Sequence, residues 1–154
     1  MITYRRETWA QFHPDCLPLL RLHHDELDPD AGFAPDIARS QQAADANVAQ
    51  IVTARDDGSL VGYCVFYVAP NLEDNGTLAA WQGPWFIDAQ HRGGTVAYRL
   101  FRLAIDELAK VGVKRAFPHH WLVGDSPKAG RIFESMGARK IEEVYTMDIP
   151  VRRT

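Results

Sequence analysis

The most constraining feature of the sequence is a strand-like segment that passes through two consecutive glycines into a long amphipathic helix. The strand-like segment is residues 85–88 (WFID), and Gly93 and Gly94 lie just before the helix expected at 95–112. The helix carries one apolar stripe at helical spacing: Ala97, Leu100, Phe101, Ala104, Leu108 and Val111. Because such a stripe is buried against another element, the segment predicts a strand, a tight turn and a helix packed on a sheet.

Strand and helix signals surround this segment. Four strands are expected before the long helix: residues 2–6, 50–55, 60–68 and 77–88. Turns at Asp57-Gly58 and around Asn75-Gly76 indicate that they form an antiparallel meander. Two more are expected after the helix: 113–117 and 139–149. Further helices are expected at three places: 15–27 with Pro18 in its first turn, 37–48 and 128–136. This order predicts an α+β fold or a mixed sheet with helices on its faces.

Length and composition limit the classes of protein. The 154 residues, 46% hydrophobic and 24% charged, fit one compact domain, residues 1–154. The net charge is −3 and the basic residues are scattered, so no nucleic acid partner is expected. There is no leader-like segment and no uncharged apolar stretch of about 18 residues, so no membrane association is expected and a cytoplasmic protein is predicted. Cys16 and Cys64 are expected to be buried, reduced and structural.

The turn before the long helix is suited to bind an anion. The first N–H groups of a helix have no internal acceptor, and the helix dipole adds roughly half a positive charge there. Gly93 and Gly94 would let oxygen atoms approach the backbone, and Arg92 adds a permanent charge. The alternative is a structural turn with Thr95 as N-cap. A nucleotide hydrolase or a dinucleotide enzyme is disfavoured, because no G-x-x-x-x-G-K-[ST] motif occurs and the turn does not open a βαβ unit.

Residues 85–117, followed by 124–140, resemble the coenzyme A core of the GCN5-related N-acetyltransferase (GNAT) superfamily, which would span about residues 60–149. The family's phosphate turn, [RQ]-x-x-G-x-[GA], aligns with Arg92-Gly93-Gly94-Thr95-Val96-Ala97, with Thr95 in place of the usual glycine. Its second motif, an Asn followed seven residues later by Tyr just before Gly-Phe, aligns with Ser126, Phe133 and Gly137-Ala138. The resemblance implies an α+β fold with a mixed, mostly antiparallel central sheet flanked by helices.

The resemblance also implies an acyl-CoA-dependent N-acyltransferase. Its simplest form moves an acetyl group from acetyl-CoA to a primary amine of a small molecule or protein by direct attack, with no metal. The backbone at 85–88 would bind the pantetheine arm, and the residues expected to bind coenzyme A are Ile87, Asp88, Arg92, Gly93, Gly94, Thr95, Val96, Ala97, Ser126 and Arg131. Transfer of a longer acyl or an aminoacyl group stays open, as does a catalytically silent domain that binds coenzyme A or a partner protein.

Glu26 and His120 are candidates for the proton acceptor. An amine with a pKa of about 10.4 is mostly protonated at neutral pH, so it needs one. Glu26 lies near His23 on one side of the first helix, in acid-rich surroundings that would attract a cationic amine. His120 follows the strand at 113–117. The alternatives are a solvated helix face for Glu26 and a surface or core histidine for His120.

Tyr145 is a candidate for the general acid. The family's tyrosine often protonates the departing thiolate, and Phe133 stands at its position here. A thiol with a pKa of about 8.5 departs unassisted at a cost of about 2 kcal/mol, so the loss is tolerable. A buried structural tyrosine is the alternative. In the predicted last strand Tyr145 shares a face with other residues: Ile141, Glu143, Met147 and Ile149. An apolar edge strand could also form a homodimer.

Overall fold

The computed structural model describes residues 1–122, 128–147 and 149. Its centre is a five-stranded sheet in the order β1-β2-β3-β4-β5. The strands are β1 (Ile2–Glu7), β2 (Ala49–Asp56), β3 (Ser59–Pro70), β4 (Leu78–Ile87) and β5 (Val113–Phe117). The first four pair in antiparallel fashion, and β5 pairs parallel to β4. The predicted α+β fold with a mixed, mostly antiparallel sheet is confirmed.

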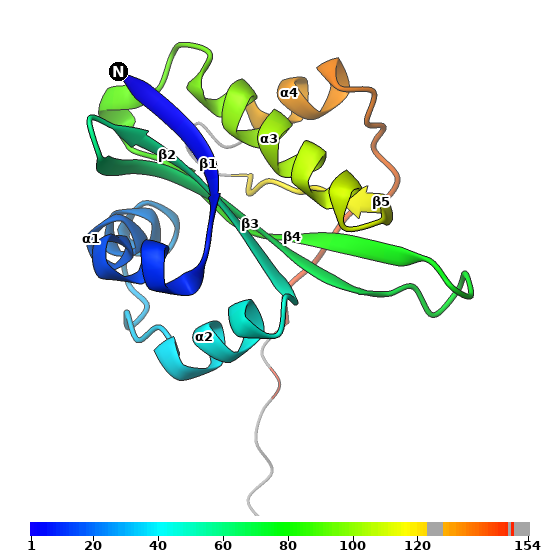
Figure 1. The fold of residues 1–154 in the computed structure, drawn as a ribbon. Helices are drawn as coiled ribbons and strands as arrows, with labels where there is room; N and C mark the ends of the chain where they lie inside the picture. The colour runs from blue at the N-terminus through cyan, green and yellow to red at the C-terminus, as the bar shows by residue number, and fades with distance from the viewer. Residues whose placement is uncertain (123–127, 148, 150–154) are drawn as a thin grey trace, which may run out of the picture.

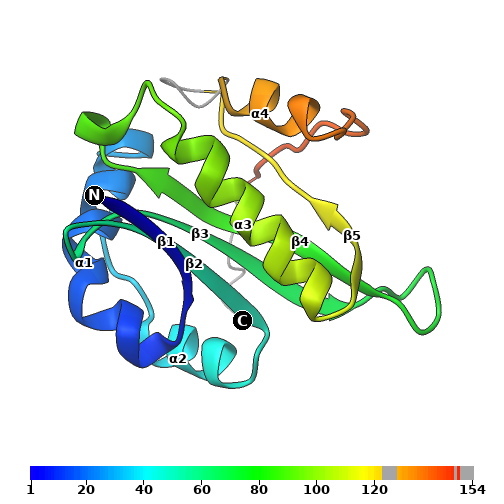
Figure 2. The ribbon, with the colours of Figure 1, turned by 45° about the horizontal axis from the view of Figure 1, so that its top comes forward.

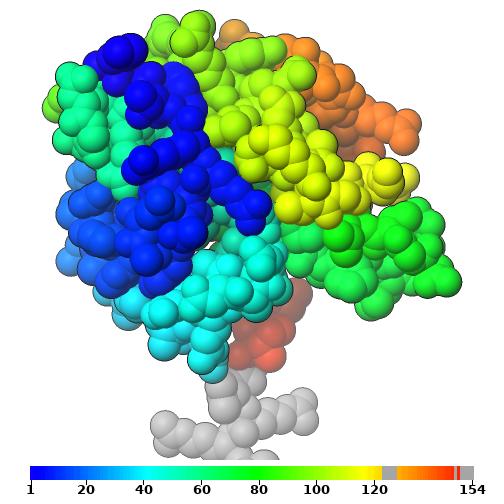
Figure 3. Space-filling model, viewed as in Figure 1, coloured from blue at the N-terminus to red at the C-terminus, as the bar shows by residue number. Residues whose placement is uncertain are grey.

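Helices cover both faces of this sheet (Figure 1, Figure 2). They are α1 (Trp9–Leu27), α2 (Ile37–Asp45), the short 3₁₀ helix η1 (Ala89–His91), α3 (Val96–Lys110) and α4 (Ala129–Ser135). On one face α3 and α4 bury Leu100, Phe101 and Phe133 against the sheet. On the other face α1 buries Phe12, Cys16 and Leu19. The space-filling view shows these layers on either side of β1, with the β3–β4 turn projecting beyond them (Figure 3).

Helix α1 begins earlier than the sequence pattern predicts. Thr8 and Gln11 form a capping box, in which the Thr8 N–H donates to Gln11 Oε1 over 2.9 Å and the Gln11 N–H donates to Thr8 Oγ1 over 3.4 Å. The prediction of Pro18 in the first turn is therefore wrong, since Pro18 lies inside the helix. The stable cap and the buried face that starts at Trp9 outweigh the lost backbone hydrogen bond at each internal proline.

Most other predicted elements are confirmed within a few residues. Strand β5 has the predicted bounds, and α3 ends before Gly112, whose φ of +89° suits the predicted C′ position. Helix α2 ends at Asp45, earlier than predicted, because Asn47 takes a positive φ of 56° and turns the chain into β2. Cys16 and Cys64 are free and buried, as expected, and burial raises the pKa of Cys16 to about 11. None of the described helices is long and apolar enough to cross a membrane.

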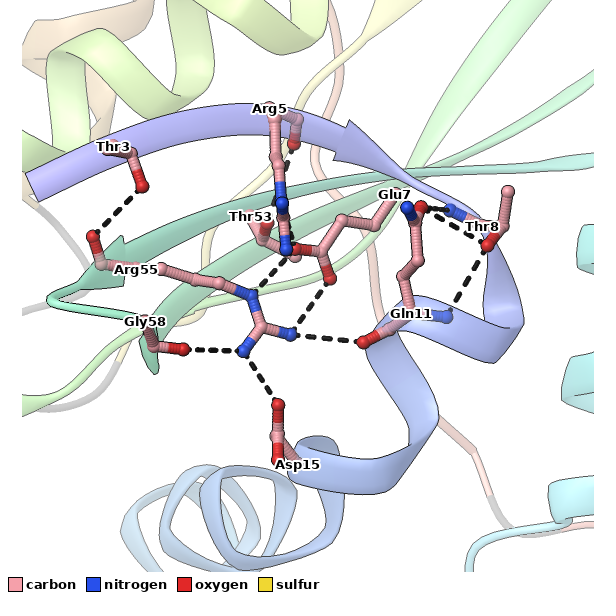
Figure 4. A network of polar contacts seen from close by, with 9 residues as sticks. All are labelled: Thr3, Arg5, Glu7, Thr8, Gln11, Asp15, Thr53, Arg55 and Gly58. Atoms are coloured by element: carbon pink, nitrogen blue, oxygen red, sulfur yellow. Dashed lines mark hydrogen bonds and ion pairs between the residues drawn. The ribbon is translucent and has the colours of Figure 1, made fainter.

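A buried ion-pair network ties β1 and β2 to the start of α1 (Figure 4). Arg55 donates to both carboxylate oxygens of Glu7 over 2.7 and 3.0 Å, to Asp15 over 2.6 Å and to the Gln11 carbonyl over 3.1 Å. Burial alone would raise the pKa of Glu7, but the hydrogen bonds from Arg55, Arg5 and Thr53 lower it. The network fixes how α1 leaves the sheet and so sets the direction in which its far end points.

The predicted last strand, 139–149, is wrong for the described residues. Residues 138–147 and 149 form no strand, and the segment leaves α4 without joining the sheet (Figure 1). The exposed fractions of its large apolar side chains are high: Ile141 60%, Val144 81%, Tyr145 85%, Met147 79% and Ile149 78%. Alternation predicts which side chains share a face, but a strand also needs a backbone partner, and the segment has none within the described part of this chain.

Candidate functional site

A cavity of about 490 Å³ opens where β4 and β5 separate. Its walls come from the end of α1, the second half of β4, the turn before α3, the residues after β5, and α4: His23, Glu26, Gln82 to Ile87, Arg92 to Gly94, Ala97, His119 to Trp121, Lys128 and Ile132. The volume lies within the range of small-molecule pockets. Segments far apart in the sequence therefore meet at one hollow.

Gln82 holds the point at which the two strands part. Backbone pairing between β4 and β5 ends at Trp81 and Phe117, while β4 continues to Ile87. The side chain of Gln82 is buried there, donates from Nε2 to the His119 carbonyl over 2.8 Å and accepts from the His119 N–H over 3.3 Å. Beyond Gln82, the edge of β4 that faces β5 has no strand partner among the described residues. This part of the edge borders the cavity.

The turn between β4 and α3 is open. Gly93 needs to be glycine because its φ is +90°. Gly94 has no positive φ, and a Cβ built on it would meet nothing within 4 Å, so neither backbone conformation nor packing explains this second glycine. Thr95 is the N-cap of α3 as predicted, but its side chain makes no capping hydrogen bond. The first N–H groups of α3 are therefore free to donate to an outside acceptor.

Arg92 lies between this turn and the end of α1. Its Nε donates to the Ile87 carbonyl over 2.8 Å, and its two terminal nitrogens donate to the two carboxylate oxygens of Glu26 over 2.9 and 2.6 Å. The guanidinium carbon lies 5.0 Å above the centre of the Phe86 ring. Arg92 and Glu26 thus form a bidentate pair across the mouth of the cavity. An anion at the turn would compete with Glu26 for Arg92.

His23 is a cavity residue that the sequence singled out only as a neighbour of Glu26. Its ring stacks on Phe86, with centroids 4.8 Å apart, and its Nδ1 lies 2.6 Å from the Tyr63 hydroxyl. Burial lowers the pKa of His23 to about 4; the nearby Glu26 raises it, and Arg92 and His24 lower it further. His23 is therefore neutral at physiological pH. The three-residue spacing to Glu26 was the available signal in the sequence.

His119 and His120 border the cavity on its other side. Burial against the pocket wall lowers the pKa of His119, and the neighbouring His120 lowers it further. Nδ1 of His120 lies 3.0 Å from the Trp121 carbonyl, so the ring nitrogen that remains for other partners is Nε2. The Trp121 carbonyl thus holds His120 in the wall of the cavity.

Most of the predicted site residues gather at this cavity. Seven line it: Glu26, Ile87, Arg92, Gly93, Gly94, Ala97 and His120. Asp88 caps η1 by accepting from the Gln90 N–H over 3.1 Å, Thr95 is exposed, and Val96 is buried in the core. Arg131 lies on α4 beside the lining residues Lys128 and Ile132 but does not itself line the cavity. Ser126 lies outside the described residues.

Tyr145 does not join the site. Its side chain is 85% exposed, and its hydroxyl donates to Glu143 over 3.2 Å. The predicted acid role placed Tyr145 in a last strand, and that strand is not formed in the described residues. Phe133 is buried against Phe101 and Trp85, with ring centroids 4.9 and 5.5 Å away, so it fills the core.

Trp85 is a donor that the sequence did not single out. Its indole Nε1 is buried and has no hydrogen-bond partner among the described residues, although the residue lines the cavity. Buried donors without partners are rare, so a ligand atom is a natural acceptor for this group. No cluster of three or more potential metal ligands occurs in the described ranges.

Comparison with known proteins gives a family match and many structural neighbours. The family model described as "Acetyltransferase (GNAT) family" matches residues 7–137. The ribosomal-protein-alanine N-acetyltransferase of Brucella melitensis biovar Abortus 2308 is similar at TM-score 0.75 and 20% identity, over 97% of this chain and 100% of its own. The aminoglycoside acetyltransferase meta-AAC0020 from an uncultured soil metagenomic sample, in complex with sisomicin, is similar at a TM-score of 0.78 and 16% identity. The match covers 98% of this chain and 97% of that chain.

A third neighbour was solved with the acyl donor. The predicted acetyltransferase with acetyl-CoA from Clostridium acetobutylicum gives a TM-score of 0.66 at 13% identity, over 96% of each chain. At these identities the neighbours establish the fold alone. No match was found among curated proteins.

Proposed function

The chain belongs to the acetyltransferase (GNAT) family, and we propose that it transfers an acetyl group from acetyl-CoA to a primary amine of a small molecule or a protein. The observation that carries the proposal is the open glycine turn at the start of α3, which leads directly into the cavity. We further propose that residues 1–154 act as one domain and work in the cytoplasm.

The described residues fit coenzyme A. Its diphosphate would be held by the free N–H groups at the start of α3, where Gly94 leaves room that packing does not require. Its pantetheine arm would follow the unpaired edge of β4 between Gly83 and Ile87. Bound there, coenzyme A supplies the activated acyl group.

The residues around the cavity would have separate roles in the acetyl transfer. The ammonium group first loses one proton; the amine nitrogen then forms a bond to the thioester carbonyl carbon, the carbon–sulfur bond breaks, and the nitrogen loses a second proton while the thiolate gains one. Backbone N–H groups of β4 would polarise the carbonyl. Glu26 attracts the ammonium group and is the first candidate for accepting its proton; His120, on the opposite wall, is the second. Tyr145 takes no part in this scheme, because it does not line the cavity and its hydroxyl donates to Glu143.

Thermal unfolding with acetyl-CoA tests the binding site. At a ligand concentration of about 100 times Kd, binding stabilises the folded chain by about 2.7 kcal/mol, which raises Tm by several degrees. Arg92→Glu should abolish the increase, because it places a negative charge beside the diphosphate. Arg102→Glu is the matched control on the exposed face of α3 and should keep it. No increase in wild-type Tm at saturating acetyl-CoA would contradict the proposal.

The alternative is a silent domain that binds coenzyme A without catalysis. The buried phenylalanine at the position of the family's tyrosine favours it. Release of free thiol from acetyl-CoA, measured across a panel of amines, separates the two, because a silent domain releases none with any amine while the Tm increase persists.

We also propose a homodimer in which the apolar C-terminal segment, residues 139–147, pairs with β5 of a second copy. The outer edge of β5 has no strand partner in the described part of the chain. Beside it, Trp81 stacks on Phe117 with centroids 5.6 Å apart and stays 42% exposed. An unpaired edge next to exposed aromatic rings is a surface that a strand with an apolar face can cover.

A further inference from the structure

His23 is held in one orientation by two contacts. Its ring stacks on Phe86 at an interplanar angle of 21°, and its Nδ1 lies 2.6 Å from the Tyr63 hydroxyl. Tyr63 and Phe86 are themselves fixed as opposite partners on β3 and β4. These two contacts restrict the orientation of the imidazole, and His23 lines the cavity.

The hydrogen-bond partners of Tyr63 decide where His23 carries its proton. Tyr63 is fully buried, and the Nδ1 of His23 is the one partner of its hydroxyl among the described residues. If Nδ1 carried the proton, the buried Tyr63 O–H would have no acceptor, which is costly. Tyr63 therefore donates to Nδ1. The neutral ring then carries its proton on Nε2.

The Nε2–H group of His23 is free to serve a ligand. It has no hydrogen-bond partner among the described residues, and unlike the Nε1 of Trp85 it is not sealed from solvent. Because burial keeps the ring neutral, Nε2 is a permanent donor and does not act as a base. It cannot serve the ammonium group of an acceptor, which itself only donates.

Glu26 lies one helical turn beyond His23 and offers the opposite chemistry. Residues three apart on a helix have Cβ atoms about 5–6 Å apart on one side. Both residues line the cavity, so a carboxylate and an N–H donor are available to a molecule that carries both an ammonium group and an oxygen acceptor. The charged groups near His23 are Glu26 and Arg92, which pair with each other; His24, the next titratable neighbour, bonds instead to the Ala31 carbonyl.

We propose that His23, oriented by Tyr63, donates from Nε2 to an oxygen of the acceptor and so selects amines that carry a hydroxyl or ether oxygen over amines that lack one. This inference rests on the proposed acetyl transfer and names the substrate class of the same site. His23 is a specificity residue in this scheme, and Tyr63 is a positioning residue that fixes the tautomer.

A matched pair of acceptors tests the selection. Trans-2-aminocyclohexanol and cyclohexylamine differ by one hydroxyl, and the wild type should acetylate the first with about tenfold higher kcat/KM, the value of one neutral hydrogen bond. His23→Phe should remove the preference and leave the KM for acetyl-CoA unchanged, and His23→Gln should restore part of it. A preference that survives in His23→Phe, or a rise in the KM for acetyl-CoA alone, overturns the proposal.

A spectroscopic readout keeps the test independent of turnover. Long-range ¹H–¹⁵N correlation spectra of the wild type with coenzyme A should show His23 as the neutral Nε2–H tautomer, and Tyr63→Phe should allow the other tautomer to appear. Addition of trans-2-aminocyclohexanol should shift the Nε2 signal, while cyclohexylamine should not. If neither amine is acetylated but this shift occurs, the proposed acetyl transfer is wrong and the hydrogen bond from His23 to the acceptor oxygen stands. An Nδ1–H tautomer in the wild type, or equal shifts with both amines, overturns that hydrogen bond. Should His23→Phe fail to fold, His23→Gln and Tyr63→Phe carry the same comparison.

Discussion

At the scale of single residues, the two adjacent glycines of the turn have different physical roles. Gly93 has a φ of +90°, which a residue with a Cβ adopts only with strain, whereas Gly94 has neither a positive φ nor a close neighbour. The sequence motif does not distinguish them. Their separate substitution therefore tells a structural glycine from one that a ligand requires.

We expect Gly93→Ala to lower the free energy of unfolding by about 1 kcal/mol, because alanine opposes the left-handed conformation. Gly94→Ala should leave stability unchanged or slightly higher and should weaken coenzyme A binding about tenfold or more, because its methyl group occupies the space of a phosphate oxygen. Urea denaturation and calorimetric titration measure the two effects. Equal coenzyme A affinity in Gly94→Ala and wild type would argue against a diphosphate at this turn.

His23 makes the stability of the chain depend on pH. Its pKa is lowered to about 4 in the folded state because it is buried, whereas an unperturbed histidine has a pKa of about 6.5. Between these values the unfolded chain binds the extra proton, so the free energy of unfolding falls as the pH falls from about 6.5 towards 4. Above about 7 both states are neutral and the effect vanishes.

The expected loss from this one group between pH 7 and pH 5 is about 2 kcal/mol. Denaturation of wild type and His23→Phe at both pH values isolates it, since all other titrating groups are common to the two proteins. A wild-type loss no larger than that of His23→Phe would mean that the folded chain protonates His23 as readily as the unfolded one.

At the scale of elements, the separation of β4 and β5 creates the cavity, and Gln82 is the clasp at its base. Its side-chain amide replaces the backbone pairing that stops at Trp81 and Phe117, with hydrogen bonds of 2.8 and 3.3 Å to His119. The strands can therefore part over a short distance without leaving buried backbone groups unpaired.

Gln82→Leu should lower the free energy of unfolding by about 1–3 kcal/mol, because it removes both partly buried hydrogen bonds between Gln82 and the backbone of His119. Hydrogen exchange in β5 should become faster. Gln90→Leu, at an exposed glutamine of η1, is the control and should change little. An unchanged rate of hydrogen exchange in β5 would show that the Gln82 side chain does not hold β4 and β5 together.

At the scale of the whole molecule, the segment 139–147 and the outer edge of β5 both lack a strand partner within the described chain. Most of the large apolar side chains of the segment are more than three-quarters exposed. They form a surface that water solvates poorly. Exchange of this segment between two copies would cover both surfaces at once and give a symmetric interface.

We expect light scattering after size exclusion to give the mass of a dimer at micromolar concentration. Tyr145→Lys should shift the population towards the monomer, because it places a charge on the apolar face. Thr146→Lys alters the neighbouring exposed position on the other face and should preserve the dimer. A wild type that stays monomeric at all concentrations would contradict the dimer and would indicate that the segment pairs with β5 of its own chain.

The sequence by itself was sufficient for the local structure of the turn and its helix. The apolar stripe, the paired glycines and Gly112 each act through neighbours along the chain, so their roles can be predicted from spacing. The meander was predictable for the same reason, because turn residues bound each strand. The capping box at Thr8 and Gln11 is an equally local signal that the first helix prediction missed.

Only the tertiary structure decided which distant residues meet. It paired Glu26 with Arg92, placed His23 on Tyr63, tied Gln82 to His119 and kept Tyr145 away from the cavity. These contacts depend on the twist of the sheet, the angle at which α1 leaves it and the absence of a partner strand for 139–147 in the described residues, none of which is encoded within one stretch of sequence. Local patterns specify elements because their interactions lie within a few residues, whereas a site depends on how those elements pack.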